Sequence, residues 1–279
     1  MERKIGGQVR GYRTKDGAGV SLVRVLADET VKEYDPILML DSFDSTNPED
    51  YTAGFPLHPH RGIETISYVY HGRMTHRDSL GNEDTIGDGE VQWMTAGSGI
   101  LHEERLPAAE RLLGVQLWLN LPAKDKMVPP AYRSIKRAEI EEIPLEGGKL
   151  RLLAGAYQGI EGFMSKYLPL DYYDIHLQPH QRVTIDTPRD RSIMVFTLVG
   201  DALIAGEPIE EKTAAKLTPG DFVQIRAGEE AVQVLFISSQ RLDEPVAWGG
   251  PIVMNTKEEL DQAFVDLKQG TFLRQGISY

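Results

Sequence analysis

The sequence predicts an all-β protein, built as two tandem β-barrels with a short helix near the C-terminal end. Short runs of apolar and β-branched residues alternate with glycine-containing turns, and no long helical period lies between them. Several motifs of the first half recur in the same order in the second half. A chain of 279 residues is long enough for two domains that each bury a core.

The first predicted barrel consists of short strands joined by tight turns. Turns are expected at Gly72, at Gly81 and at 87–89, because glycine and its polar neighbours favour chain reversals. The predicted strands are 20–26, 64–70, 74–78, 91–94 and 112–119.

The second half carries its own strands and then changes character. The predicted strands are 150–154, 172–177, 182–185, 192–199, 202–204, 222–225 and 231–237. An apolar stripe with spacing i, i+3, i+4, i+7 then predicts a helix with one packing face, capped by Asn255 or Thr256 and ended by Gly270. The stripe consists of Leu260, Ala263, Phe264 and Leu267.

Two histidine motifs in the first half predict a metal site. His58 and His60 are two residues apart, as are His102 and Glu104. Residues two apart on a strand project from the same face, so two antiparallel strands would aim three imidazoles and one carboxylate at one point. Such groups bind divalent transition metals. The turn at 97–99, with glycine at both ends, would swing the second pair inward.

The internal repeat predicts that only one barrel holds a metal. We expect domains at 1–122 and 123–279, the first binding metal and the second lacking the ligands. The order of motifs pairs His58 with Gln178 and His102 with Gln233. One remaining histidine beside two amides and an aliphatic residue makes a poor transition-metal site.

Composition narrows the classes of partner. The formal net charge is −12, which argues against direct nucleic-acid binding and against anionic membrane surfaces. No apolar run approaches about 20 residues. Cysteine is absent, which excludes disulfides and cysteine-type zinc sites. These features predict a cytoplasmic protein.

Four stretches, 55–65, 92–104, 116–121 and 250–256, resemble the pirin family of the cupin superfamily. The resemblance implies a bicupin of two jelly-roll barrels, with one Fe(II) in the N-terminal barrel. By position, it implies the ligands His58, His60, His102 and Glu104. Other metals remain open, because these ligands also accept Mn, Ni, Co, Cu or Zn.

The resemblance further implies quercetin 2,3-dioxygenase activity, the ring opening of flavonols by O2 with release of carbon monoxide. Two carboxylates are candidate catalytic bases for the flavonol hydroxyl, namely Glu104 and Glu64. Glu64 follows the His-x-His motif, where many cupins place a glutamate ligand. Its spacing from His58 and His60 is even, which predicts a common face.

Two other functions remain open at this point. Some pirins resemble transcriptional co-regulators, so the metal could serve a non-enzymatic redox sensor that acts through protein partners. A cupin chemistry without oxygen, such as sugar isomerisation, is a third reading, because a fold does not fix a function. We expect a monomer whose partners are a small aromatic substrate, a flavonol, and O2.

Overall fold

The computed structural model describes residues 1–274 of the chain and divides it into two compact units. The first, here called the aliphatic unit, comprises Met1–Tyr12, Val25–Pro36 and Ala138–Arg241. The second, the histidine unit, comprises Arg13–Arg24, Ile37–Arg137 and the chain from Leu242 onward. The expected boundary between residues 122 and 123 therefore falls inside the histidine unit, and both terminal stretches pack with the strands of the other half.

The histidine unit is a sandwich of two antiparallel sheets. Its four-stranded sheet, here called the histidine sheet, has the order β5-β10-β7-β8, with β5 Phe55–His60, β10 Ile100–Arg105, β7 Met74–Asp78 and β8 Glu83–Ile86. The seven-stranded sheet has the order β12-β9-β6-β11-β4-β3-β2, with β12 Ala131–Ile135, β9 Glu90–Thr95, β6 Ile63–His71, β11 Leu112–Asn120, β4 Ile37–Ser45, β3 Val20–Leu26 and β2 Tyr12–Asp16. A small ribbon pairs β25 Ala247–Gly249 with β26 Ile252–Met254.

The aliphatic unit repeats this architecture. Its four-stranded sheet, the aliphatic sheet, has the order β18-β23-β20-β21, with β18 Arg182–Asp186, β23 Phe222–Ala227, β20 Ala202–Ile204 and β21 Glu207–Ile209. The seven-stranded sheet has the order β1-β22-β19-β24-β17-β14-β13, with β1 Ile5–Arg10, β22 Thr213–Leu217, β19 Ser192–Val199, β24 Val232–Ser239, β17 Leu170–Leu177, β14 Gly148–Ala154 and β13 Glu141–Leu145. A ribbon pairs β15 Ala156–Tyr157 with β16 Ile160–Glu161.

Helices are short and peripheral to these sheets. The α-helices are α1 Val31–Tyr34 and α2 Lys257–Gln269, and the 3-10 helices are Asp28–Thr30, Pro48–Asp50, Ala123–Asp125 and Arg137–Glu139. Thr256 caps α2 in a capping box with Glu259, and Gly270 ends it in the left-handed conformation. No helix of the described residues is long and apolar enough to cross a membrane.

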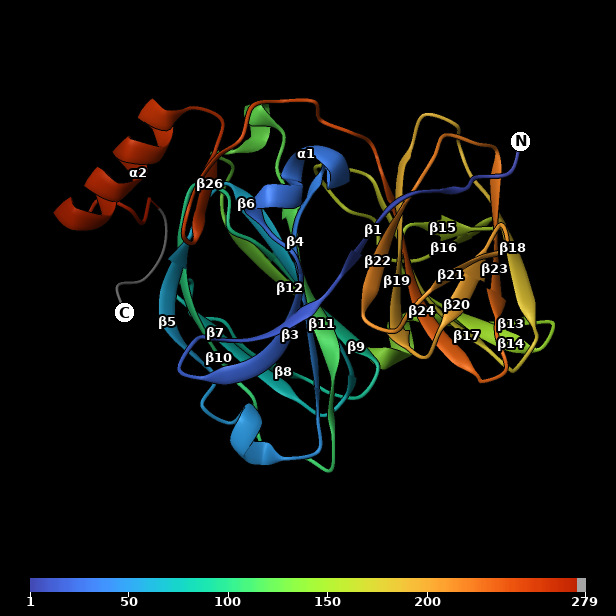
Figure 1. Ribbon diagram of the computed structural model, residues 1–279. Helices are drawn as coiled ribbons and strands as arrows, with labels where there is room; N and C mark the ends of the chain where they lie inside the picture. The colour runs from blue at the N-terminus through green and yellow to red at the C-terminus, as the bar shows by residue number, and fades with distance from the viewer. Residues whose placement is uncertain (275–279) are drawn as a thin grey trace. The chain divides into compact units, whose positions relative to one another are not determined.

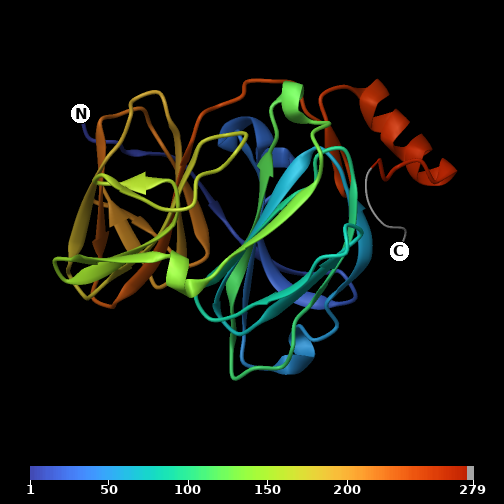
Figure 2. The ribbon, with the colours of Figure 1, turned by 180° about the vertical axis from the view of Figure 1, so that it is seen from behind.

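The C-terminal segment packs on the histidine unit rather than on the strands that precede it in the chain. Figures 1 and 2 show α2 and β26, in red, against a sandwich drawn mainly in blue and green. Arg61, which directly follows β5, is buried there. Its guanidinium donates to Asp266 at 2.7 Å and to the Phe272 carbonyl at 3.0 Å, and it lies over the Phe272 ring. The segment is thus attached to the end of a histidine motif.

The predicted all-β bicupin class and its terminal helix are confirmed. β3, β7, β19 and β20 have the predicted bounds, and the other predicted strands are found with small shifts at their ends. The packing face of α2 is also found, since Ala263 is buried in a cluster with Ile252, Met254 and Phe272. Phe264, predicted on that face, remains 43% exposed.

Candidate metal centre

The histidine sheet brings both motifs together through its strand register. His102 of β10 lies opposite His58 of β5 on one side and opposite Asp78 of β7 on the other. Glu104 lies opposite His76. Residues directly opposite each other in an antiparallel ladder share a face, so these side chains project to the same side of the sheet.

His58, His60 and His102 form a group that could hold a metal ion. Their candidate ligand atoms all lie within 4.8 Å of one another. The ring centroids are 4.7 Å apart for His58 and His60, 4.3 Å for His58 and His102, and 5.1 Å for His60 and His102. His60 and His102 are buried whereas His58 is half-buried, so the His58 side is the open side of the group.

Hydrogen bonds at Nδ1 orient two of the three rings. Nδ1 of His58 lies 2.8 Å from the Pro56 carbonyl, and Nδ1 of His60 lies 2.8 Å from the Pro251 carbonyl. A carbonyl only accepts, so Nδ1 must carry the proton in both rings. The lone pair is then on Nε2, and the two Nε2 atoms face each other at 3.0 Å.

The third ring is oriented by another imidazole. Nδ1 of His102 lies 3.4 Å from Nδ1 of His76, and Nε2 of His76 lies 2.8 Å from the Asp78 carboxylate. Nε2 of His102 is buried and has no hydrogen-bond partner. An unpaired buried acceptor is costly, and a metal ion would satisfy it. The residues present therefore fit a divalent transition metal held by three Nε2 atoms.

Burial keeps these ligands neutral. Desolvation, reinforced by the nearby His58, lowers the pKa of His60 to about 3. Desolvation also lowers the pKa of His102 well below its ordinary value, and His58 and His60 add to the effect. A neutral imidazole is the form that binds a metal, so both rings are ready to act as ligands near neutral pH.

Glu104 lies on the same face but is held by two glutamines. Gln92 donates to Oε1 at 2.5 Å, and Gln116 donates to Oε1 and Oε2 at 3.1 and 2.9 Å. Glu104 is 2% exposed. The structure places it next to the three histidines along the sheet, but its carboxylate is not part of the compact group that they form. Its role as fourth ligand or base stays a prediction.

Glu64 projects from the opposite face of the seven-stranded sheet. On β6, Ser67 shares a face with Gln92 and Gln116, which reach Glu104. Glu64 is three residues before Ser67, so it points the other way. It accepts from Thr95 at 2.6 Å, and desolvation raises its pKa. The structure therefore does not bring Glu64 to the histidines, and its role as a base also stays a prediction.

The glycines of the two motifs are needed for their turns. Gly97 and Gly99 have φ values of 49° and 137°, which side-chain-bearing residues rarely adopt, and they reverse the chain before β10 as predicted. Gly62 has φ 81°, and a Cβ there would lie 2.0 Å from the Val253 carbonyl. The backbone N–H of Gly62 donates to the Gly97 carbonyl at 2.8 Å, which joins the two turns.

The site residues predicted from the sequence do not include four polar residues of this centre. His76 and Asp78 have the same i, i+2 spacing as His58 and His60, which was a usable signal. Gln92 and Gln116 are single polar residues within apolar strands, and a buried amide needs a hydrogen-bond partner.

The predicted residue correspondence between the halves is wrong. By sheet order, β18 and β23 are the counterparts of β5 and β10. Gln233 instead lies on β24 in the seven-stranded sheet, and Gln178 precedes β18. Loops of different length shift the spacing of the motifs, so similarity of short stretches did not give the true register.

Only one group of side chains in residues 1–274 is close enough to hold an ion. Among the histidines, cysteines, aspartates and glutamates of this range, it is the one group of three or more, and it consists of His58, His60 and His102.

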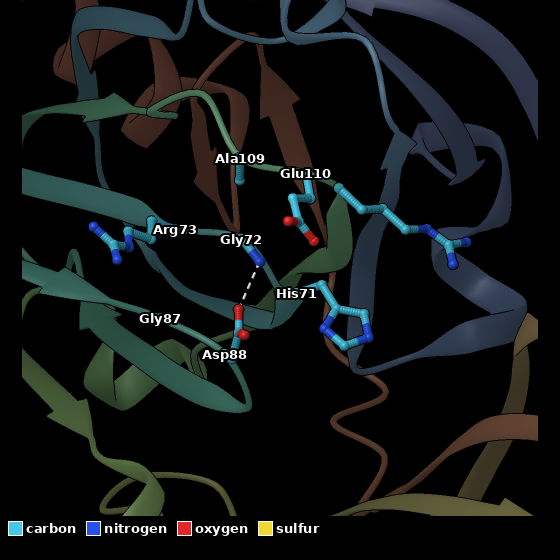
Figure 3. A pocket seen from close by; sticks show the side chains of 8 residues that line it. His71, Gly72, Arg73, Gly87, Asp88, Ala109 and Glu110 are labelled. Carbon is cyan, nitrogen blue, oxygen red and sulfur yellow. Dashed lines mark hydrogen bonds between the residues drawn. The ribbon is translucent and has the colours of Figure 1, made fainter.

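A concavity lies at the end of β6 that is distant from the triad. Its volume is about 620 Å³, and Figure 3 shows that side chains around His71, Asp88 and Glu110 line it. Gly72 donates its N–H to Asp88 at 2.8 Å. Thr65, which is opposite Trp118 beside the triad, is six residues from His71. The two ends are therefore about 20 Å apart along the strand.

Comparison with known proteins agrees with this architecture. The pirin family model matches residues 19–119, and the model of the pirin C-terminal cupin domain matches residues 172–273. A pirin-like protein of Caulobacter vibrioides is 39% identical over 272 residues, covering 95% of this chain and 97% of that protein. The chain belongs to the pirin family.

Solved structures are similar to this pirin along most of the chain. A crystal structure of quercetin 2,3-dioxygenase from Acinetobacter baumannii is 34% identical, has a TM-score of 0.90 and covers 100% of both chains. The bacterial pirin YhhW from Escherichia coli, crystallised in complex with nickel(II), is 19% identical with a TM-score of 0.65. It covers 84% of this chain and 98% of its own, and at this identity it supports the fold alone.

Proposed function

We propose that this pirin is a metal-dependent dioxygenase that opens the ring of quercetin-like flavonols with O2, and that Fe(II) is its metal. One observation carries the proposal. Three imidazoles converge through Nε2, and that of the buried His102 has no other partner. The similarity to the Acinetobacter quercetin 2,3-dioxygenase supports the choice of substrate class.

A divalent metal held by this triad would supply Lewis-acid chemistry, polarising the flavonol hydroxyl and lowering its pKa. The residues of the chain would do the rest. Because His58 is half-buried and the other two ligands are buried, substrate would approach from the His58 side. Because His60 and His102 are buried, their rings are held in place and water is excluded from their side of the site.

Glu104 is the carboxylate that we assign to the hydroxyl proton. It lies on the same sheet face as the triad, whereas Glu64 lies on the opposite face of the neighbouring sheet. The amides of Gln92 and Gln116 donate to its oxygens and stabilise the anion, which is the form that accepts a proton. We also propose that Glu104 is the fourth ligand, with His58, His60 and His102 as the others.

Oxygen uptake by the Fe(II)-loaded protein with quercetin tests this function. We expect uptake by the wild type, none above background for His58→Ala, and a kcat about 100-fold lower or more for Glu104→Gln. His176→Ala is the control. It too removes an imidazole, but His176 lies in the aliphatic unit, where it pairs with an aspartate two residues away. It should leave uptake unchanged.

Three outcomes would overturn the proposal or one of its assignments. A folded wild type that holds one Fe(II) per chain but consumes no O2 with quercetin would exclude flavonol oxygenation. Full activity of Glu104→Gln would exclude Glu104 as the base. Loss of activity in Glu64→Gln, with the metal retained, would transfer that role to Glu64.

A further inference from the structure

On β7, the strand that pairs with the His102 strand β10, a carboxylate and an imidazole form a buried pair that the proposed function does not use. His76 and Asp78 are 0% and 3% exposed, and both lie on β7 of the histidine sheet. Nε2 of His76 is 2.8 Å from Asp78, and Nδ1 of His76 is 3.4 Å from Nδ1 of His102. The three side chains therefore form one chain of contacts that ends at the ligand atom of His102.

The contacts fix where the protons are. The carboxylate of Asp78 accepts, so a neutral His76 carries its proton on Nε2 and offers a lone pair at Nδ1. That lone pair accepts the Nδ1–H of His102. The lone pair of His102 is then on Nε2, the buried atom that lacks a partner and lies within the triad. The opposite tautomer of His102 would direct a hydrogen at the other two ligands.

The pair is itself held from several sides. Asp78 accepts the backbone N–H of Leu80 at 2.8 Å and the side-chain amide of Asn82 at 2.9 Å. The ring of Tyr132 stacks on His76 with a centroid distance of 4.2 Å and an interplanar angle of 11°. The carboxylate and the imidazole therefore have little freedom to rotate, which keeps the contact with His102 in place.

This support differs from that of the other two ligands. His58 and His60 each rest on a backbone carbonyl, which is neutral. His102 instead contacts the His76 ring, which in turn contacts the carboxylate of Asp78. A carboxylate that accepts from a ligating histidine, directly or through a second ring, makes that ligand more basic and fixes its orientation.

We propose that His76 and Asp78 are positioning residues that hold His102 in its metal-binding tautomer and strengthen it as a donor. The proposal rests on the proposed function only in that the triad must bind a metal. Neither residue belongs to the triad, and each acts through His102.

Co(II) binding tests the proposal without any turnover, because Co(II) takes the same imidazole ligands and its visible spectrum reports its coordination. Affinity is measured by competition with a chelator, and folding by thermal unfolding of the metal-free protein. We expect His76→Phe to weaken Co(II) binding about 10- to 100-fold and to change the spectrum. We expect His76→Gln to restore affinity to within a few-fold, since its amide can both accept from His102 and donate to Asp78.

Two further variants separate positioning from a general structural role. Asp78→Asn keeps the volume and an acceptor but removes the charge, so we expect an intermediate affinity. His176→Phe breaks the Asp174–His176 pair, 2.9 Å apart in the aliphatic unit, and should leave Co(II) affinity unchanged.

The outcomes distinguish this proposal from the proposed function. A wild type that binds no Co(II) would overturn both. A wild type that binds Co(II), with equal affinities and spectra for folded His76→Phe and His76→Gln, would overturn the positioning role alone. If His76→Phe does not fold, Asp78→Asn decides, and an unchanged affinity and spectrum in that folded variant would reject the role.

Discussion

The histidine sheet and the aliphatic sheet have corresponding strand orders, but the buried face of the first carries polar side chains and that of the second carries aliphatic ones. In the histidine sheet, the residues that share the face of the centre include His58, His102, Glu104, His76 and Asp78. In the aliphatic sheet, the strands in the same positions bury Val183, Ile185, Val223, Ile225, Ala202 and Ile204. One backbone arrangement therefore accommodates either a polar centre or an ordinary core.

The comparison shows that a polar interior needs a second layer of partners. Each triad histidine has a partner at Nδ1, and Glu104 has two glutamine donors. Aliphatic side chains need packing only, so the aliphatic sheet needs no such layer. A single substitution should remove the metal from one sheet more easily than it could create a site in the other.

The largest effect is expected from His102→Leu. The variant should bind Fe(II) or Co(II) roughly 100-fold less tightly or worse, because one of the three imidazole donors is lost. Its metal-free form should still fold, since the corresponding strand of the aliphatic sheet, β23, buries branched apolar residues. Chelator competition and thermal unfolding measure the two effects. Wild-type affinity in this variant would refute the triad.

The reverse change, Ile225→His, should lower the free energy of unfolding by about 2–4 kcal/mol. Ile225 is 0% exposed and packs among aliphatic residues, so a new imidazole would lack hydrogen-bond partners. Urea unfolding measures the loss, and the volume-conserving Ile225→Leu is the control, expected to cost less than about 1.5 kcal/mol. A fully stable Ile225→His protein would contradict the need for a second layer.

A pH effect is expected from a buried lysine of the histidine unit. Burial lowers the pKa of Lys126 to about 7, against the opposing effect of Glu244 and Glu259. Between pH 7 and about 10, Lys126 then binds more protons in the unfolded chain than in the folded protein. The free energy of unfolding should therefore increase by up to about 1.4 kcal/mol per pH unit.

The matched variant for this effect is Lys126→Met. The ammonium of Lys126 donates to the carbonyls of Gly62 and Val253 at 2.7 and 2.9 Å, so the variant loses those bonds at every pH. Its stability should nevertheless lack the increase above pH 7. Urea unfolding at pH 7 and pH 9 gives the difference, and equal slopes for the two proteins would contradict the assignment.

The smallest effect is expected from Glu64→Gln. Oε2 of Glu64 is buried without a hydrogen-bond partner, and desolvation raises the pKa of the carboxyl, so the charged form is disfavoured. A neutral amide should change the free energy of unfolding by less than about 1 kcal/mol and leave metal affinity unaltered. Glu104→Gln is the comparison, because it should weaken metal binding. Equal losses in both variants would contradict the opposite placement of the two carboxylates.

Predictions from the sequence succeeded where they depended only on the alternation of side chains along a single strand. The i, i+2 spacing placed His58 and His60 on one face, because alternation along a strand is a property of the backbone. The same rule failed for Glu64. Counting from His60 crosses the turn at Gly62, whose positive φ interrupts the alternation and begins a strand in the other sheet.

The sequence by itself determined the two-barrel class, the strands and the spacing that puts His58 and His60 on one strand face, since these follow from local periodicity and turn chemistry. Only the tertiary structure decided which partners stand behind them. Pro251 reaches His60 from 191 positions along the chain, and Gln116 reaches Glu104 across two sheets. Such contacts depend on the register between strands and on the packing of sheets, and no short-range pattern encodes either.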